Sequence, residues 1–167
     1  QLRSVVDAVL VGSNTVIADN PSLTVRLTHG RNPKRIILDS SLKTPIESNV
    51  YQDEFKHLTY VLTSKHADPE KIKAFRSLGI HVECLDFDLN LDLHLVKKYL
   101  LQLKIYSLMV ESGKTLTTEI LRQNVWNEMW WMISPMILGG MRAVGDLYLQ
   151  GIEQHIKIDD IKLETVD

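Results

Sequence analysis

One stretch of the chain, residues 106–119, combines residue types that bind charged ligands. It begins as a short apolar run that ends in Glu111, continues through a turn at Gly113, and then reads as the start of a helix. A helix N-terminus carries free N–H groups and the positive end of the helix dipole, which favour phosphate groups. The stretch therefore predicts a fixed carboxylate beside a phosphate-binding helix start.

The segment Ser112-Gly113-Lys114-Thr115 also matches the end of the phosphate-binding loop of nucleotide-hydrolysing enzymes. That motif requires a glycine five positions before Gly113, but position 108 is a leucine inside the apolar run. The motif is therefore excluded, because the loop of backbone amides that surrounds the phosphate has no room to form. Two interpretations stay open: Gly113 admits a ligand close to the backbone, or it is a turn residue and the threonines cap the helix.

Three acidic residues, Asp19, Asp39 and Glu111, each follow an apolar segment. Ligands of open parallel sheets bind at the carboxyl ends of the strands, so these acids could form part of a site. Each acid could equally cap the helix that follows it. Their occurrence at three matching positions favours a shared functional edge.

The composition argues against several other classes of function. The net charge of −2 provides no basic surface for nucleic acid, and no apolar run approaches the roughly 18–20 residues that cross a membrane. The six histidines are scattered without metal-ligand spacing, so no metal site is expected. The single cysteine, Cys84, falls in a strand that we expect to be buried, which argues against a catalytic thiol. One cysteine also fits a reducing, cytoplasmic location.

Apolar runs typical of strands buried on both faces alternate with helical patterns. Strands are expected at residues 7–12, 34–39, 58–63, 80–85 and 106–111, with further strands at 128–134 and 156–165. Helices are expected at residues 13–19, 68–78, 92–104 and 113–123, whereas residues 44–55 are expected to be irregular. Asp68 and Pro69 are typical of a helix start, and Gly79 of a helix end. The order predicts a single α/β domain over residues 1–167, with a mainly parallel sheet and antiparallel strands toward the C-terminus.

Four segments in order resemble the reductase domain of the bifunctional riboflavin-biosynthesis deaminase/reductase. They are residues 7–26 (DAVLVGSNTVIADNPSLTVR), 33–45, 110–116 and 127–140. The resemblance covers nearly the whole chain, and the first segment is the most specific. It implies a dihydrofolate-reductase-like fold, with a mostly parallel mixed sheet flanked by helices. The activity it implies is the NADPH-dependent reduction of the ribosylamino side chain of 5-amino-6-(5-phosphoribosylamino)uracil to the ribitylamino form.

The resemblance also implies roles for individual residues. Three residues would contact the substrate: Leu23, Arg26 and Glu111. Ten residues would contact the cofactor: Thr15, Asp19, Ser40, Gly113, Lys114, Thr115, Leu116, Thr117, Thr118 and Glu119. Arg26 is suited to the substrate phosphate, because a guanidinium group binds phosphate through two parallel hydrogen bonds.

The chain departs from the family pattern in several places. The family has Gly-Gly-Pro where this chain has Ser112-Gly113-Lys114, and an acid at the position of Asn20. The family's first strand, with a lysine near the reacting centre, would precede Gln1, so we expect the domain to lack its first and final strands. No catalytic residue is therefore assigned. A zinc deaminase domain could belong to the same protein.

Two other functions stay open. Asn20, Ser112 and Asn127 favour a non-catalytic nucleotide-binding or assembly domain of the same fold. A related reductase acting on another pterin or pyrimidine substrate would differ only in details of the pocket. The late tryptophans, among them Trp130, offer apolar area for packing, so a homodimer or larger homo-oligomer is expected.

Overall fold

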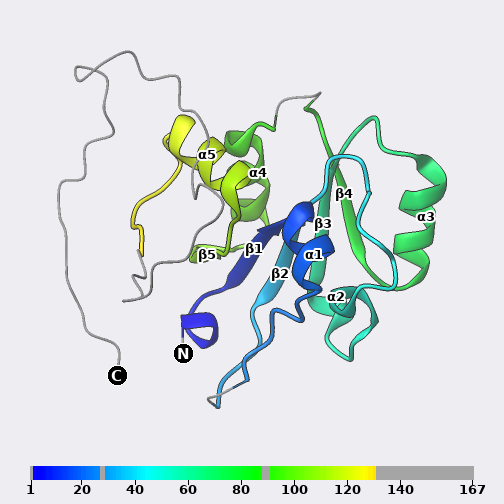
Figure 1. The fold of residues 1–167 in the computed structure, drawn as a ribbon, viewed down its shortest axis with the longest axis horizontal. Helices are drawn as coiled ribbons and strands as arrows, with labels where there is room; N and C mark the ends of the chain where they lie inside the picture. Colours follow the sequence, from blue (N-terminus) through cyan, green and yellow to red (C-terminus); the bar gives the residue numbers. More distant parts are fainter. Residues whose placement is uncertain (1, 27–28, 88–90, 131–167) are drawn as a thin grey trace, which may run out of the picture.

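A five-stranded parallel sheet forms the centre of the computed structural model, which describes residues 2–26, 29–87 and 91–130 (Figure 1). The strands are β1 (Ala8–Gly12), β2 (Lys34–Leu38), β3 (Thr59–Ser64), β4 (His81–Leu85) and β5 (Leu108–Val110). Their order is β4-β3-β2-β1-β5, and every neighbouring pair is parallel. The chain therefore moves outward from β1 to β4 and then returns to place β5 on the other side of β1.

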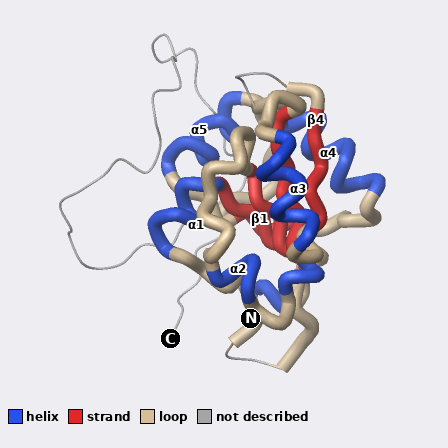
Figure 2. Tube along the Cα trace, turned by 90° about the vertical axis from the view of Figure 1, so that its right-hand side faces the viewer, coloured by secondary structure: helices blue, strands red, loops and turns tan. Residues whose placement is uncertain are grey.

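Helices cover both faces of this sheet (Figure 2). They are η1 (Leu2–Ser4), α1 (Ser13–Asp19), α2 (Asn49–Gln52), η2 (Lys56–Leu58), α3 (Pro69–Ser77), α4 (Leu93–Gln102) and α5 (Lys114–Arg122). Alternate residues of a strand point to opposite faces. Val9 and Val11 of β1 accordingly pack in one cluster with α1, α2 and α3, whereas Ala8 and Leu10 pack in another with α4 and α5. The central strands are mostly buried because both faces are covered, and the polar residues Arg35, Thr59 and Thr63 are buried among them.

The helix-start signals in the sequence are confirmed. The Asp68 side chain accepts a hydrogen bond from the Glu70 N–H at 2.9 Å, and Pro69 is the first residue of α3. Asp92 caps α4 in the same way, by accepting bonds from the N–H groups of His94 and Leu95. Gly79 follows α3 with φ of +84°, a conformation that glycine adopts at no steric cost.

The expectation that β4 and β5 are buried strands is wrong for the residues described. These two strands form the edges of the described sheet, so fewer elements cover them. Cys84 is exposed. Val82, two residues earlier on β4, packs in the core cluster that includes α3, whereas Cys84 lies in an open hollow lined by residues of α3. In β5, Leu108 and Val110 are 37% and 36% exposed. An apolar run alone does not distinguish a central strand from an edge strand.

Other expectations need smaller changes. The segment 44–55, expected to be irregular, contains the short helix α2. Residues 128–130 form no strand, and the rest of the strand expected at 128–134 lies outside the described residues, as does the strand expected at 156–165. The expected antiparallel strands therefore also lie outside them. Within the described part of the chain, no helix combines the length and apolar character needed to cross a membrane.

Asp7 joins the start of β1 to the start of β5. Its Oδ2 atom accepts hydrogen bonds from the backbone N–H groups of Tyr106 and Ser107, both at 3.0 Å. Its Oδ1 atom accepts a bond of 2.7 Å from Arg31. The Tyr106 N–H, followed by the Arg31 guanidinium and Ser107, holds the pKa of the Asp7 carboxyl well below its usual range. Asp7 therefore helps to fix the register in which β1 and β5 pair.

Replacing Asp7 by asparagine should lower the melting temperature at neutral pH. A depressed folded-state pKa means that the ionised carboxylate contributes stability above its unfolded value of about 4, and that this stability is lost as pH falls through the folded pKa. Asp7→Asn should therefore also flatten the fall in melting temperature below about pH 4, measured by thermal denaturation across a pH series. Glu47→Gln, at an exposed acid before α2, should keep the wild-type pH dependence. A wild-type pH dependence in Asp7→Asn would contradict the assignment.

Candidate functional site

The carboxyl ends of β1 and β5 lead into two neighbouring helix N-termini. β1 continues directly into α1, and β5 continues through Glu111 and two further residues into α5. Leu10 pairs with Val110, and the Glu111 N–H donates to the Leu10 carbonyl at 3.0 Å. The strand order reverses here, because β2 lies on one side of β1 and β5 on the other. Open α/β sheets bind ligands at such reversal points.

Both of these helices begin without a side-chain cap. Gly12 and Gly113 occupy the N-cap positions of α1 and α5, and neither helix has a side-chain capping bond within the described residues. Asp68 and Asp92 cap α3 and α4, whereas the four-residue helix α2 also begins without a side-chain cap. The interpretation in which threonines cap α5 is therefore wrong. The first-turn N–H groups of the nine-residue helix α5 are suited to an anionic ligand.

Thr15 and Gly113, both predicted cofactor contacts, lie close together. A Cβ atom built on Gly113 would lie 3.9 Å from the Thr15 Oγ1 atom. Gly113 has φ of −80°, which any residue can adopt, so the turn itself does not require glycine. A Cβ at this distance makes an ordinary contact, so packing does not require glycine either, and the approach of a ligand at Gly113 stays a prediction.

The predicted residues at the start of α5 fall into two groups. Lys114 and Thr115 are exposed. Leu116 is buried in the core cluster that contains α4, so its side chain faces away from solvent. The Thr118 hydroxyl is also buried and donates to the Lys114 carbonyl at 2.7 Å. The exposed side chains of Lys114 and Thr115, in the first turn of α5, are free to contact a ligand. Leu116 and Thr118 instead face the interior of the domain.

The remaining two predicted residues of α5 already have protein partners. The Thr117 and Ser112 hydroxyl oxygens lie 2.7 Å apart in a hydrogen bond that closes the turn before α5. The Glu119 carboxylate pairs with Arg122 and also accepts a bond from Gln123. Both residues therefore stabilise the helix and its turn in this structure.

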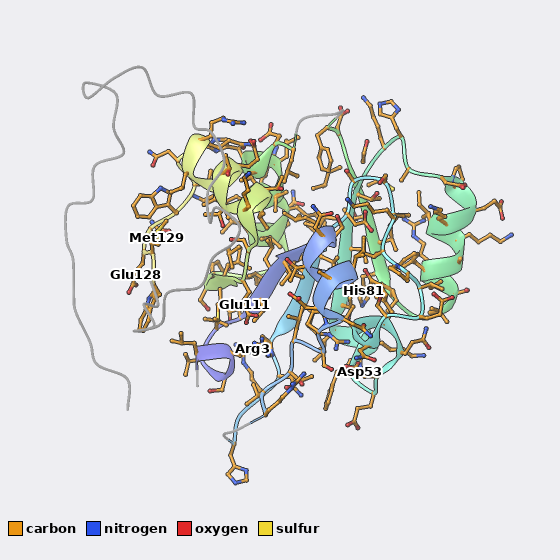
Figure 3. The ribbon with its side chains drawn as sticks, in the orientation of Figure 1. Arg3, Asp53, His81, Glu111, Glu128 and Met129 are labelled. Carbon is orange, nitrogen blue, oxygen red and sulfur yellow. The ribbon has the colours of Figure 1, made fainter. Side chains whose placement is uncertain are left out.

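Glu111 is held by Arg3, a residue that the sequence analysis did not identify (Figure 3). Arg3 Nε and Nη2 donate to the two carboxylate oxygens of Glu111 at 2.6 and 2.7 Å, and Nη1 donates to the Thr24 carbonyl at 3.0 Å. The hydrogen bond with Glu111 raises the pKa of Arg3. Both side chains are about a quarter exposed, at 28% and 27%. Arg3 therefore links Glu111 to the loop that carries Arg26.

No local signal could have identified Arg3 as part of this site. It lies in η1, ahead of β1, and is separated from Glu111 by 108 positions in the sequence. Only the parallel pairing of β1 with β5 brings the two residues together. An arginine before a strand is otherwise an ordinary surface residue.

The other two acids do not join Glu111 in a shared site. Asp39 is only 1% exposed, and its carboxylate accepts bonds from the N–H groups of Lys43 and Thr44 and from the Thr44 hydroxyl, at 2.7–3.0 Å. It therefore stabilises the turn after β2 and does not cap α2, whose N-cap residue is Ser48. Asp19 is exposed at the far end of α1. Ser40, a predicted cofactor contact, is exposed directly after β2.

The loop at residues 20–26, termed loop 20–26, carries the two other predicted substrate contacts. Arg26 is exposed. Leu23 is fully buried and packs in the core cluster with Val9 and Tyr51. The Leu23 side chain therefore belongs to the core and anchors the loop, and Arg26 stays the predicted substrate contact of this loop whose side chain is exposed.

Comparisons with known proteins agree with this architecture. The model of the RibD C-terminal domain family matches residues 1–167. A riboflavin biosynthesis protein RibD of Aquifex aeolicus is 36% identical over 99% of this chain and 45% of its own length. A 2,5-diamino-6-ribosylamino-4(3H)-pyrimidinone 5′-phosphate reductase of Methanothermobacter thermautotrophicus is 36% identical over 98% of this chain and 74% of its own length. The chain thus spans less than half of the RibD relative.

Solved structures show the same similarity. RibD of Acinetobacter baumannii superposes with a TM-score of 0.75 and 25% identity, over 93% of this chain and 42% of that chain. A deaminase/5-amino-6-(5-phosphoribosylamino)uracil reductase of Thermotoga maritima superposes with a TM-score of 0.56 and 31% identity, over 72% of this chain and 31% of that chain. The expected dihydrofolate-reductase-like α/β fold is confirmed.

Replacing Lys114 by alanine should weaken the binding of NADPH, the cofactor that the resemblance implies. Loss of one charge-assisted bond to phosphate corresponds to about 1.4 kcal/mol, or roughly a tenfold rise in the dissociation constant. Isothermal titration calorimetry measures this change. Lys97→Ala removes an exposed lysine from α4 and should leave the affinity unchanged. Equal affinities for Lys114→Ala and the wild type would contradict the placement of phosphate at α5.

Proposed function

Because the chain belongs to the family of RibD C-terminal domains, we propose that it catalyses a reduction in riboflavin biosynthesis. The proposed substrate is 5-amino-6-(5-phosphoribosylamino)uracil, whose ribosylamino side chain is reduced to the ribitylamino form with NADPH. The observation that carries this proposal is the uncapped start of α5 at the β1–β5 reversal point, with Glu111 in the turn that leads into it. Relatives named riboflavin biosynthesis protein RibD and 2,5-diamino-6-ribosylamino-4(3H)-pyrimidinone 5′-phosphate reductase support it.

The residues at the reversal point fit a nicotinamide dinucleotide. The first-turn N–H groups of α5 suit a diphosphate, and Gly113 leaves the backbone open to close approach. Thr15, Lys114 and Thr115 would bind the cofactor through their side chains. When bound, a nicotinamide cofactor supplies the hydride, and the protein supplies position and electrostatics. Asp19 and Ser40 are both exposed and remain predicted contacts.

Arg26 and Glu111 would orient the substrate. Arg26 is exposed at the end of loop 20–26, where its guanidinium can bind a phosphate group. Glu111 carries a carboxylate that is held in place by Arg3 and can accept hydrogen bonds from polar groups of the substrate. Arg3 connects the two positions, because it also binds the Thr24 carbonyl in loop 20–26.

A non-catalytic domain of the same fold is the second candidate, and it rests on the departures from the family pattern. Two of these departures keep the local structure intact. Asn20 has φ of 44°, which asparagine tolerates, and its Oδ1 atom accepts a bond from the Asn49 N–H that an aspartate could equally accept. Ser112 is not among the described residues with positive φ, so its turn does not require a second glycine. These departures therefore argue only weakly against activity.

The proposal also includes partners. The Thermotoga maritima relative is named for both deaminase and reductase activities, and the chain covers 45% of a RibD relative. A deaminase domain in the same protein is therefore part of the proposal. Trp130 is 56% exposed and Met129 is 37% exposed. Exposed large apolar side chains such as these favour association into a homodimer or larger homo-oligomer.

The full-length protein provides the direct test. Calorimetry with NADPH and with NADH measures cofactor binding, and the loss of NADPH absorbance measures reduction of the pyrimidine substrate. Binding together with turnover is the expected result. NADPH binding without turnover of any pyrimidine would support the non-catalytic candidate. Turnover of a pterin or another pyrimidine alone would support the related reductase.

Replacing Arg26 by alanine should affect the substrate much more than the cofactor. Removal of a charged bond to phosphate should raise the KM of the pyrimidine substrate by about 10- to 100-fold, while the KM of NADPH changes by less than about twofold. Steady-state kinetics measures both constants. Arg76→Ala removes an exposed arginine from α3, beside β4 at the opposite edge of the sheet, and should change neither. A comparable rise in both constants would show that Arg26 does not face the substrate phosphate.

A further inference from the structure

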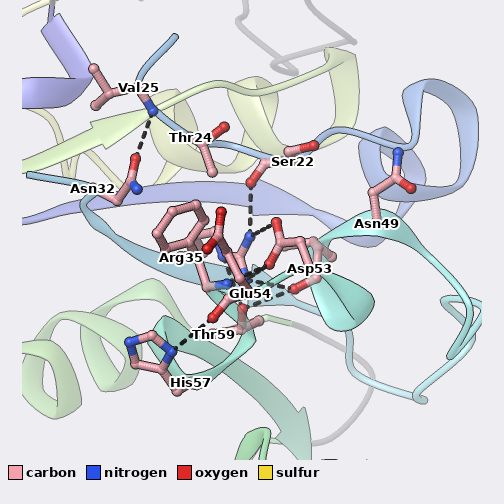
Figure 4. Close-up of polar contacts among 12 residues, drawn as sticks. Ser22, Thr24, Val25, Asn32, Arg35, Asn49, Asp53, Glu54, His57 and Thr59 are labelled. Carbon is pink, nitrogen blue, oxygen red and sulfur yellow. Dashed lines mark hydrogen bonds and ion pairs between the residues drawn. The ribbon is translucent and has the colours of Figure 1, made fainter. Parts of the chain in front are cut away.

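A buried arginine on β2, Arg35, connects loop 20–26 to α2 (Figure 4). Arg35 is only 1% exposed. Its Nη1 atom donates to the Ser22 carbonyl at 2.9 Å and to Asp53 Oδ2 at 2.6 Å, and Nη2 donates to the Val50 carbonyl at 2.8 Å and to Asp53 Oδ1 at 2.9 Å. Nε donates to the Thr59 hydroxyl at 3.0 Å. These bonds use all five N–H donors of the guanidinium group.

Loop 20–26 depends on such contacts for its conformation. None of its residues belongs to a helix or strand. Asn20 and Leu23 have φ of 44° and 55°, a left-handed conformation that is unfavourable for leucine in particular. The local sequence alone does not favour this backbone path, so tertiary contacts must hold it.

The contacts of α2 and Arg35 reach this loop at two points. Arg35, paired with Asp53 just after α2, holds the Ser22 carbonyl. Asn49, the first residue of α2, donates its N–H to Asn20 Oδ1 at 2.8 Å and its side-chain amide to the Asn20 carbonyl at 3.0 Å. Both contacts end on backbone or side-chain oxygens of the loop, on the N-terminal side of Arg26.

The chemistry of the Arg35–Asp53 pair favours a geometric role. Arginine is charged at every relevant pH, so its burial requires the Asp53 carboxylate. Buried ion pairs commonly add little net stability compared with apolar residues of the same size. A guanidinium fork, in contrast, fixes the direction of every acceptor around it. This geometry is useful where a backbone segment must be held in one position.

We propose that Asp53, Arg35 and Asn49 are positioning residues that hold loop 20–26 and thereby place Arg26 for the substrate. The inference rests on the proposed function, in which Arg26 binds the substrate phosphate. It adds that a segment remote from the helix starts, α2 with its following turn, sets the affinity for substrate without contacting it.

Asp53→Asn in the full-length protein is the direct test. The change keeps the shape and one acceptor oxygen but removes the charge that pairs with Arg35. We expect the KM of the pyrimidine substrate to rise about tenfold, with kcat and the dissociation constant of NADPH changed by less than about twofold. Glu54→Gln removes the same charge from the next residue, which is exposed, and should behave as the wild type. An unchanged substrate KM in Asp53→Asn, or an equal change in Glu54→Gln, would overturn the inference.

Hydrogen exchange supplies a readout that does not depend on activity. Backbone amides in loop 20–26 should exchange faster in Asp53→Asn, while those of β1, β2 and β3 keep wild-type rates. Uniformly faster exchange across the sheet would show a general loss of stability and overturn the positioning role. If the wild type does not reduce the pyrimidine, the proposed function fails, and the exchange rates of loop 20–26 still decide whether Asp53 positions it.

A second variant covers the case in which Asp53→Asn does not fold. Asn49→Ala removes only an exposed side chain and its single bond to the Asn20 carbonyl. It should raise the substrate KM and the exchange rate of loop 20–26 in the same direction by a smaller amount. Gln52→Ala, on the same helix with its side chain bonded to the Ile46 carbonyl, is its control. Equal behaviour of Asn49→Ala and Gln52→Ala would overturn the inference.

Discussion

The parallel pairing of β1 with β5 is the constraint on which the candidate site depends. β1 and β5 are far apart in the sequence, and the Asp7 carboxylate holds their starts together by accepting the N–H groups of Tyr106 and Ser107. Because the two strands are parallel, their carboxyl ends meet at one edge, and so do the helices that follow them. The pairing thereby places the starts of α1 and α5 beside Glu111.

The helices of this domain differ in how their first turns are satisfied, and the short helix α2 between β2 and β3 also lacks a side-chain cap. α3 and α4 begin with aspartate caps, which satisfy N–H groups within the chain. α1 and α5 begin at glycines without a side-chain cap. A fold that needed only stability would gain from caps at all four positions. The two uncapped starts lie at the point where the strand order reverses, which fits a phosphate-binding role.

Two arginines hold the backbone of loop 20–26, which follows α1 directly. Arg3 binds Glu111 and the Thr24 carbonyl, while Arg35 binds Asp53 and the Ser22 carbonyl. Each one therefore joins a carboxylate to the backbone of loop 20–26. The loop has no regular structure, yet its backbone is held from both sides. The backbone that leads to Arg26 is thus held in place even though it lies outside every helix and strand.

The sequence by itself determined the α/β class, the central strands, the caps of α3 and α4, and the strand–turn–helix order of residues 106–119. The strands and helices follow from the spacing of apolar residues along the chain. The caps follow from aspartate side chains that bond N–H groups two or three residues later. Tertiary structure decided that Asp39 stabilises its own turn, that Leu23 is buried, that Cys84 is exposed, and that Arg3 holds Glu111. Each of these outcomes depends on which strands are neighbours and which helix covers them. A local residue pattern cannot predict a contact such as the one between Arg3 and Glu111, which are 108 positions apart in the sequence.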